Sequence, residues 1–275
     1  MTDMTGRVKA FFELHKPGSP LFLPNAWDYA SAAALAQCGY PAIGTTSLGV
    51  AAAAGKPDAG GQTRQENLAL ARRLGRIPVL LTVDIEAGFS DDPHSVADLA
   101  EQLAEAGAVG VNIEDGRPDG SLAATEDHCA KVAAVKERVP AMFVNARTDA
   151  FWLAPEGAEP PIEEAISRGA AYVAAGADGV FVPAAADAGI VAALAARIAA
   201  PLNILYMPGR HDMASLAASG VARVSTGSLL FRAALGAAME TADSASGQSD
   251  AGAPKLPSYG DVQAMITKFE SRSTT

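Results

Sequence analysis

The sequence has few of the residues that mark disulfide-bonded, zinc-binding or nucleic-acid-binding proteins. Its 275 residues include only two cysteines, Cys38 and Cys129, and no Cys-x-x-Cys pair, so neither a disulfide framework nor a zinc cluster is indicated. The four histidines are scattered without a metal-binding pattern, and we expect them on solvated helix starts and faces. The net charge of −10, without any basic run, would repel nucleic acid.

Long hydrophobic runs and several short motifs are also missing. No apolar run approaches the roughly 20 residues of a transmembrane helix, and the first residues lack the apolar core of a signal peptide, so we expect a cytoplasmic protein. The Gly-x-Ser-x-Gly motif of serine hydrolases and the Gly-x-Gly-x-x-Gly motif of dinucleotide-binding folds are absent. What is present is a globular composition, 49% hydrophobic and 19% charged, with enough length for a large core.

One local pattern occurs four times along the chain. An Ala-rich helical end is followed by glycine and then by a short apolar strand, in ALAQCGYPAIGTT, LAEAGAVGVNIED, YVAAGADGVFVPA and SLAASGVARVSTG. The glycines Gly39, Gly107, Gly176 and Gly220 fit the left-handed position that follows a helix. Because the strands are apolar throughout, they indicate a parallel sheet covered by helices.

Further strands are predicted at 21–26, 78–86, 141–149 and 202–207. Helices are predicted between the strands, at about 27–38, 62–75, 93–106, 124–138, 161–175, 187–198, 211–219 and 227–240. Eight β/α units predict a (β/α)₈ TIM barrel, an α/β fold. The alternative is a doubly wound open sheet, which usually has a glycine-rich first turn where this chain reads PNAWDYAS.

The composition changes near residue 241. We assign residues 1–241 to the barrel, residues 242–257 to a flexible linker rich in Ser, Ala, Gly and Pro, and residues 258–275 to a C-terminal helix. A short isolated helix is marginal in water, so this one must dock on its own barrel or on a neighbouring subunit.

Polar residues gather where the predicted strands end, which is where a barrel carries its active site. Three neighbouring strands have polar pairs at spacing i, i+2, which places each pair on one strand face. The pairs are Asp84/Glu86, Asn112/Glu114 and Asn145/Arg147, and further strand residues are Thr45, Thr46, Ser47, Asp149 and Asn203. Three converging carboxylates need a cation, and oxygen ligands suit Mg²⁺ or Mn²⁺. Arg147 could pair with Glu114 or bind a substrate carboxylate.

The segments NAWDYASA, GTTSLGVA, GKPDAGG, VDIEAGF, VNIEDG and NARTDAF resemble, in order and spacing, the signatures of the isocitrate lyase/phosphoenolpyruvate mutase superfamily. The resemblance covers about residues 20–240. It implies a (β/α)₈ barrel, a Mg²⁺ site, and a small 2-oxo acid or its enolate as the bound species. It also implies a homotetramer in which a C-terminal helix is swapped between neighbours.

The resemblance also implies roles for single residues. Asp84 resembles the main metal ligand, with Glu86 and Glu114 holding the metal's waters. The segment Thr45, Thr46, Ser47 and Leu48 resembles the part that binds the substrate carboxylate. Arg147 resembles the arginine at the oxo-acid end, and Asp58 the aspartate of a flexible loop near the reaction centre. We therefore predict Asp58, Glu114 and Arg147 as catalytic, and add Asn112 and Asn203 to the substrate-binding residues.

Two features depart from the family pattern. The stretch EDGRPDGSLAATEDHC lacks the KKCGH-type motif of the lyases, and it lacks the longer Lys- and Asn-containing loop of the phosphonomutases. The general acid or base is therefore unassigned among Asp58, Glu114, Arg117 and Tyr206. We predict a Mg²⁺-dependent lyase that cleaves a C–C bond of a small 2-oxo or 2-hydroxy di- or tricarboxylate through an enolate. The alternatives are a phosphonomutase or phosphonopyruvate hydrolase, and a non-catalytic barrel that binds 2-oxo acids.

Overall fold

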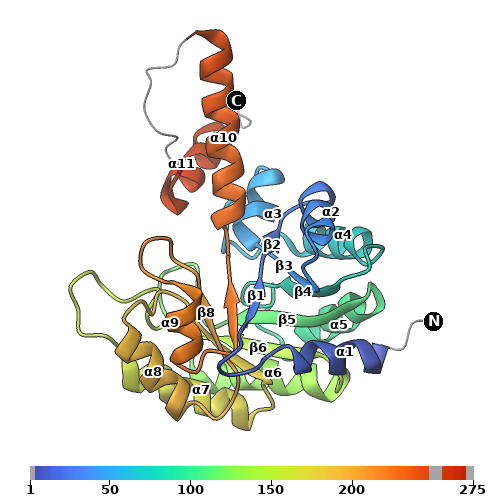
Figure 1. Ribbon diagram of the computed structural model, residues 1–275. Coiled ribbons are helices and arrows are strands. Elements are labelled where there is room, and N and C mark those ends of the chain that lie inside the picture. Colours follow the sequence, from blue (N-terminus) through green and yellow to red (C-terminus); the bar gives the residue numbers. More distant parts are fainter. Residues whose placement is uncertain (1–3, 248–255, 271–275) are drawn as a thin grey trace.

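The computed structural model, which describes residues 4–247 and 256–270, contains one parallel sheet that closes on itself (Figure 1). Its first strand is interrupted at Pro24 and has two halves, β1 (Leu21–Leu23) and β2 (Asn25–Ala26). β1 pairs with β9 and β2 pairs with β3, so the interrupted strand joins the two edges of the sheet. The predicted TIM barrel is confirmed, and the open doubly wound sheet is ruled out.

The remaining strands follow in chain order around the barrel, and all neighbouring pairs are parallel. They are β3 (Ala42–Thr45), β4 (Leu80–Asp84), β5 (Ala108–Glu114), β6 (Phe143–Arg147), β7 (Gly179–Val182), β8 (Leu202–Leu205) and β9 (Arg223–Ser225).

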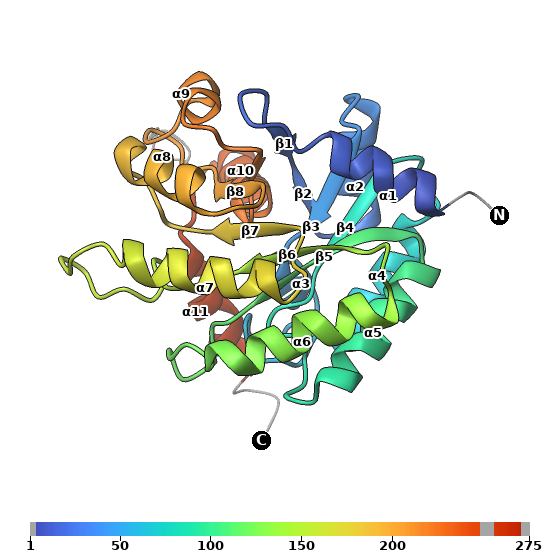
Figure 2. The same cartoon turned by 90° about the horizontal axis from the view of Figure 1, so that it is seen from below.

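The helices surround the sheet, as the view from below shows (Figure 2). They are α1 (Met4–Glu13), α2 (Tyr29–Gln37), α3 (Ser47–Ala53), α4 (Arg64–Leu74), α5 (Pro93–Glu105), α6 (Thr125–Arg138), α7 (Ile162–Ala174), α8 (Ala188–Arg197), α9 (Met213–Ala218), α10 (Leu229–Ser246) and α11 (Tyr259–Glu270). The eight helices predicted between the strands are present. The sequence reading did not predict α1 or α3, although Ala-rich residues favour α3.

The glycines that follow α2, α5, α7 and α9 have the backbone conformation expected of them. The φ angles of Gly39, Gly107, Gly176 and Gly220 are 86°, 97°, 107° and 84°. A side chain would be strained at such angles, so these glycines allow each helix to turn directly into the following strand.

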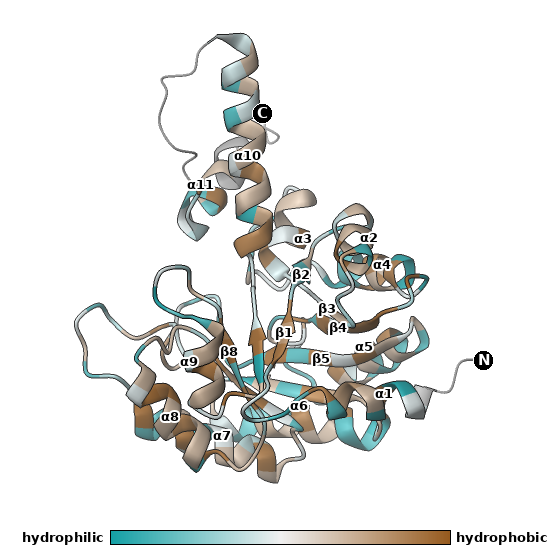
Figure 3. Ribbon diagram, in the orientation of Figure 1, coloured by the Kyte–Doolittle hydropathy of each residue, from teal (hydrophilic) through white to brown (hydrophobic). Residues whose placement is uncertain are grey.

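Apolar side chains form the interface between the sheet and its helices, and Figure 3 shows hydrophobic segments along β3, β4 and β8. Two of the four histidines lie in this interior, so the expectation that all are solvated is wrong. His15 stacks on Phe143 at 4.4 Å between ring centroids, and His128 packs against Tyr172 at the same separation. Burial lowers the pKa of His15 to about 3 and that of His128 to about 4.

The C-terminal part leaves the barrel at its mouth. α10 projects away from the strands, and α11 packs beside its base, against α3 (Figure 1). α10 continues to Ser246 and ends at Gly247, so residues 242–246 are helical and not part of a linker as predicted. Residues 248–255 and 271–275, which the linker and C-terminal helix predictions include, lie outside the described residues.

The last helix docks on the barrel of its own chain. Val262 of α11 is 1% exposed and lies in one apolar cluster with Leu48 of α3 and Phe231 of α10. This arrangement is one of the two that the sequence left open. The exchange of this helix between subunits stays a prediction.

Candidate active site

A cavity of about 820 Å³, including its open mouth, lies at the carboxyl ends of the strands. It is the place where parallel barrels carry their active sites, because the loops that follow the strands converge there. Four carboxylates line it, from the ends of three neighbouring strands and from the loop between α3 and α4. They are Asp84, Glu114, Asp149 and Asp58.

The carboxylates share a poorly solvated space, which changes their protonation. Burial raises the pKa of Asp58, Asp84 and Asp149, and raises that of Glu114 well above its usual value. The positive charge of Arg147 acts in the opposite direction on all four. The cavity therefore holds more negative charge than it can keep ionised without a further cation.

Arg147 is held in one orientation by contacts on several sides. Its Nη1 lies 2.7 Å from Oε2 of Glu114, and its Nε donates to Oδ1 of Asp149 at 2.6 Å. The guanidinium carbon lies 5.8 Å from the Trp152 ring centroid and 5.6 Å from that of Phe181. The ion pair with Glu114, one of the two roles open from sequence, is formed, and the grip on a substrate carboxylate stays a prediction.

Two of the three pairs at spacing i, i+2 lie entirely within a strand, and the third does not. Asn112 and Glu114 both lie within β5, and Asn145 and Arg147 both lie within β6. In contrast, β4 ends at Asp84, and Glu86 has a positive φ of 50°. The expectation that Asp84 and Glu86 share a strand face is therefore wrong, because the chain has already left the strand at Glu86.

Glu86 instead faces the loop between α3 and α4. Its Oε1 accepts a hydrogen bond from the Thr63 hydroxyl at 2.6 Å, and its Oε2 accepts one from the Gly61 amide at 3.0 Å. Burial raises its pKa to about 7. It lines a neighbouring hollow and not the cavity of Asp84, so its predicted role in holding a metal's water stays a prediction without direct geometric support.

The segment predicted to bind a carboxylate is the start of α3. The helix begins at Ser47 after Thr46, so its first amides lack partners within the helix, and the residues of this turn lie at the cavity. The Ser47 side chain lowers the pKa of Asp58, and the Ser47 backbone lowers the pKa of Asp84, both against the larger effect of burial. Thr46, Ser47 and Leu48 line the cavity. Thr45 does not line it, and its hydroxyl accepts a hydrogen bond from the Asp84 amide at 2.9 Å.

The two asparagines predicted to bind substrate lie at different depths. Asn112 lines the cavity, and its Oδ1 accepts hydrogen bonds from Asn145 and from the buried Arg223. Asn203 lies in the barrel interior, where its Oδ1 accepts a hydrogen bond from Ser225, and it does not line the cavity. Its predicted contact with substrate therefore has no support from its position.

Three of the four candidates for the general acid or base line the cavity, and one does not. Asp58, Glu114 and Arg117 line the cavity. Tyr206 does not line the cavity, and its ring packs against Phe22 and an apolar cluster of the barrel. Its position does not support a catalytic role.

Asp149 was noted from the sequence at a strand end but was given no role in the site. Among the cavity residues that the sequence did not indicate are Tyr259, Trp152 and Phe181. The Tyr259 hydroxyl donates to Oδ2 of Asp58 at 2.8 Å, across 201 residues of sequence. Tyr259 and Asp58 meet because α11 docks beside α3, and the sequence does not indicate where α11 docks.

The donor atoms fit a Mg²⁺ ion held partly by water. Within residues 4–247 and 256–270, no three His, Cys, Asp or Glu side chains form a group that could hold a metal ion. Mg²⁺ does not need such a cage, because it usually keeps several waters and binds one or two carboxylates. Asp84 offers one carboxylate in the cavity, and Oδ1 of Asp58 is a buried oxygen without a hydrogen-bond partner.

The sequence and the fold are similar to those of known proteins. The family model for phosphoenolpyruvate phosphomutase matches residues 11–245. An uncharacterized protein of Mycobacterium tuberculosis is 43% identical over 270 residues, 97% of this chain and 99% of its own length. The 2-methylisocitrate lyase of Salmonella typhimurium is 35% identical over 190 residues, 61% of this chain and 62% of the enzyme.

A solved structure agrees with the sequence comparisons. The crystal structure of a putative phosphonomutase from Burkholderia cenocepacia J2315 is 34% identical, with a TM-score of 0.82 over 86% of this chain and 99% of that one. The family resemblance seen in the motifs is thereby confirmed. The chain belongs to the phosphoenolpyruvate phosphomutase family, within the isocitrate lyase/phosphoenolpyruvate mutase superfamily of lyases and mutases.

Proposed function

We propose that the protein is a Mg²⁺-dependent lyase, with Mn²⁺ as an alternative ion, that cleaves a carbon–carbon bond of a small 2-oxo or 2-hydroxy acid. The observation that carries the proposal is the convergence of Asp84, Glu114 and Arg147 with the start of α3 in one cavity. This set combines a metal ligand, a cation for the oxo-acid end and the first turn of a helix for a carboxylate.

Asp84 would hold the ion directly, and Glu114 would hold one of its waters. A bound Mg²⁺ would supply the positive charge that stabilises an enolate as it develops on the substrate. The first amides of α3 bind the substrate carboxylate, because they have no partner within the helix. Arg147, held by Glu114 and Asp149, orients the oxo-acid end.

The proton transfer belongs to the carboxylates of the cavity. Burial raises the pKa values of Asp58 and Glu114, so either group can exchange a proton closer to neutral pH than an exposed carboxylate. Asp58 has the additional hydrogen bond from Tyr259. We assign the acid or base role to Asp58, with Tyr259 as its positioning partner.

A second candidate is the cleavage of a phosphorus–carbon bond, as a phosphonomutase or phosphonopyruvate hydrolase. It is favoured by the phosphoenolpyruvate phosphomutase model and by the likeness to the Burkholderia putative phosphonomutase. A non-catalytic barrel that binds 2-oxo acids is a third candidate, because the KKCGH-type motif of the lyases is absent.

One substrate screen separates these candidates. Purified protein and Mg²⁺ are incubated with isocitrate, 2-methylisocitrate, 2,3-dimethylmalate, oxaloacetate, 4-hydroxy-2-oxo acids and phosphonopyruvate, and the release of pyruvate, glyoxylate and phosphate is followed. Turnover of carbon substrates supports the lyase. Turnover of phosphonopyruvate alone would refute it, and tight oxalate binding without any turnover would favour the binding protein.

We also propose that the enzyme works as a cytoplasmic homo-oligomer on small molecules, without a nucleic-acid or membrane partner. In the part of the chain that the structure covers, none of the helices is both long and apolar enough to cross a membrane. We propose a homotetramer in which neighbouring subunits exchange their α11 helices, and truncation before α11 should change the oligomer mass.

A further inference from the structure

The wall of the active-site cavity changes character around the barrel. On the side of β4, β5 and β6 it carries the carboxylates and Arg147. The next two strands in barrel order, β7 and β8, present apolar side chains, and so does the loop after β6. The apolar residues are Trp152, Leu153, Phe181, Pro183 and Leu205.

The two arginines that line the cavity are already paired, although Arg147 lies beside Phe181 and Trp152 of this apolar wall. Among the described lining residues, two arginines accompany four carboxylates. Arg147 is engaged by both Glu114 and Asp149. Arg117 lies at the rim with a side chain 45% exposed, 3.5 Å from Asp127. A second negative charge on a substrate would therefore find no free cation at β7 or β8.

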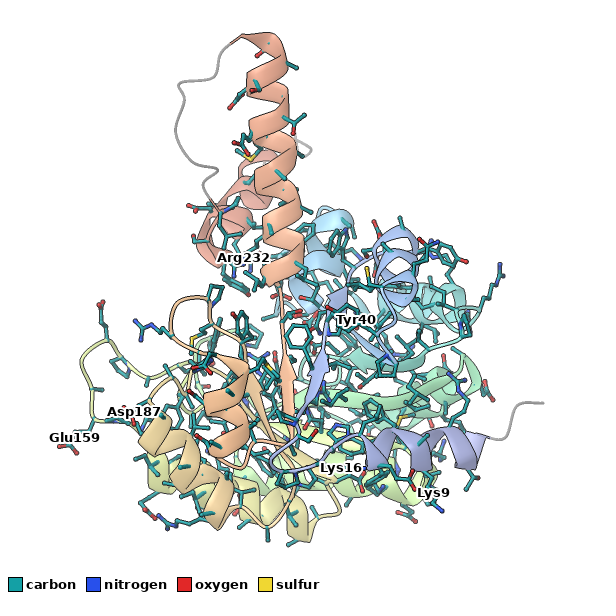
Figure 4. The ribbon with its side chains drawn as sticks, in the orientation of Figure 1. Lys9, Lys16, Tyr40, Glu159, Asp187 and Arg232 are labelled. Carbon is teal, nitrogen blue, oxygen red and sulfur yellow. The ribbon has the colours of Figure 1, made fainter. Side chains whose placement is uncertain are left out.

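The polar groups beyond β8 are uncharged, and most of them have partners within the protein. The Ser225 hydroxyl donates to Asn203, and the Gly227 amide donates to Asn25. Ser228 accepts a hydrogen bond from Nε of Arg232 at 3.2 Å. Arg232 lies at the base of α10 (Figure 4) and does not line the cavity. Its Nη1 donates a hydrogen bond to the carbonyl of Pro257.

Building on the proposed function, we propose that the substrate is a 4-hydroxy-2-oxo acid with a single carboxylate and with an uncharged, apolar group on carbon 4. Asp58, the proposed base, takes the proton of the 4-hydroxyl, the bond between carbons 3 and 4 breaks, and an aldehyde leaves with the apolar group. The remaining enolate takes a proton at carbon 3 and becomes pyruvate.

The carboxylate end takes the side of Asp84, Arg147 and α3, so the substituent on carbon 4 faces Phe181, Pro183 and Leu205. An alkyl group gains from burial there, whereas a second carboxylate would lose its hydration without a partner. The proposed substrate therefore has fewer carboxylates than the di- or tricarboxylate predicted from the sequence.

A matched pair of ligands tests the proposal. Freshly dissolved oxaloacetate and 4-methyl-2-oxopentanoate share the 2-oxo acid end and differ in a carboxylate against an isopropyl group. Calorimetry with Mg²⁺ should give at least about tenfold tighter binding of 4-methyl-2-oxopentanoate, with oxalate as the common reference. Equal or tighter binding of oxaloacetate would overturn the inference and leave the proposed function standing. If neither ligand nor oxalate binds, both fail.

A charge placed on the apolar wall gives a second test. Leu205→Arg adds a cation at the end of β8, where the native side chain is half-buried, and it should reverse the preference in favour of oxaloacetate. Leu205→Met is the uncharged control and should keep the native preference. An unchanged ratio in Leu205→Arg, with oxalate affinity retained, would show that the substituent lies elsewhere. A loss of oxaloacetate affinity in Arg232→Gln would also contradict the proposal.

Discussion

At the residue scale, Asp84 should decide whether the protein binds Mg²⁺. It is the carboxylate that ends β4 inside the cavity, next to the first amides of α3. Asp84→Ala should abolish Mg²⁺ binding in calorimetry at millimolar metal, because it removes the direct ligand. Asp98→Ala, which removes an exposed carboxylate of α5 paired with Arg138, is the control and should bind as the native protein does. Undiminished binding by Asp84→Ala would place the metal elsewhere.

Tyr259 should influence the reaction through Asp58. Its hydroxyl donates to the Asp58 carboxylate, which stabilises the charged form and lowers the pKa of Asp58. In Tyr259→Phe the pKa of Asp58 should rise, and the acidic limb of the kcat/KM profile should move upward by about one pH unit.

Tyr206→Phe is the matched control for Tyr259→Phe, because Tyr206 packs in the barrel wall outside the cavity. The two variants remove the same hydroxyl from different places. A profile that does not move in Tyr259→Phe, or that moves equally in both variants, would refute the positioning role.

At the scale of secondary-structure elements, Glu86 joins the end of β4 to the loop before α4. Its pKa rises from 4.5 to about 7 through burial, so the folded protein holds a proton that the unfolded chain releases. Stability from this group is therefore present below pH 4.5 and is lost as the pH rises through 7. Glu86→Gln should remove this loss, of about 1–3 kcal/mol, in urea unfolding at pH 5 and pH 8. If the free energy of unfolding changed equally between pH 5 and pH 8 in Glu86→Gln and in the native protein, the raised pKa of Glu86 would be contradicted.

A buried hydrogen-bond network connects α7 to the strand ends that carry the site. Oδ2 of Asp115 accepts from the Tyr172 hydroxyl at 2.6 Å and lies 3.2 Å from Arg168, while Oδ1 accepts from the Asp149 amide. Tyr172→Phe should lower the free energy of unfolding by about 1–3 kcal/mol, since a buried acceptor loses a partner.

The surface ion pair of the same network provides the control for Tyr172→Phe. Glu164→Gln breaks the pair between Arg168 and a glutamate whose side chain is 51% exposed, and exposed pairs contribute about 0–1 kcal/mol. Chemical unfolding of both variants should therefore show the larger loss in Tyr172→Phe. Equal losses would mean that the buried hydroxyl adds nothing.

At the scale of the whole molecule, α10 and α11 extend beyond the barrel and should govern assembly. Met239 of α10 is 57% exposed, and Val262 of α11 covers Leu48 and Phe231. A chain that ends after residue 247 should therefore have a different oligomer mass in light scattering from the full chain. A chain that ends at residue 270 keeps α11 and should match the full chain. The same mass for all three would contradict a role of α11 in assembly.

The sequence by itself determined the barrel, the turns after the helices and the acid-rich mouth. These features follow from local patterns: apolar strands of a parallel sheet, glycines at positive φ, and polar residues at strand ends, all set by neighbours in the chain. Asp84, Glu114 and Arg147 were found in this way, because a parallel barrel brings its strand ends to one mouth. Asp58 was predicted only from the resemblance to the superfamily.

Only the tertiary structure decided which of these groups meet and what faces them. Glu86 turns to the loop at Gly61 and Thr63, because the strand ends two residues before it. Tyr259 reaches Asp58 through a docked helix, and Phe181 and Leu205 add an apolar wall to the cavity that holds the carboxylates. Such contacts join residues far apart in sequence, and their energies depend on packing and burial that no local pattern records.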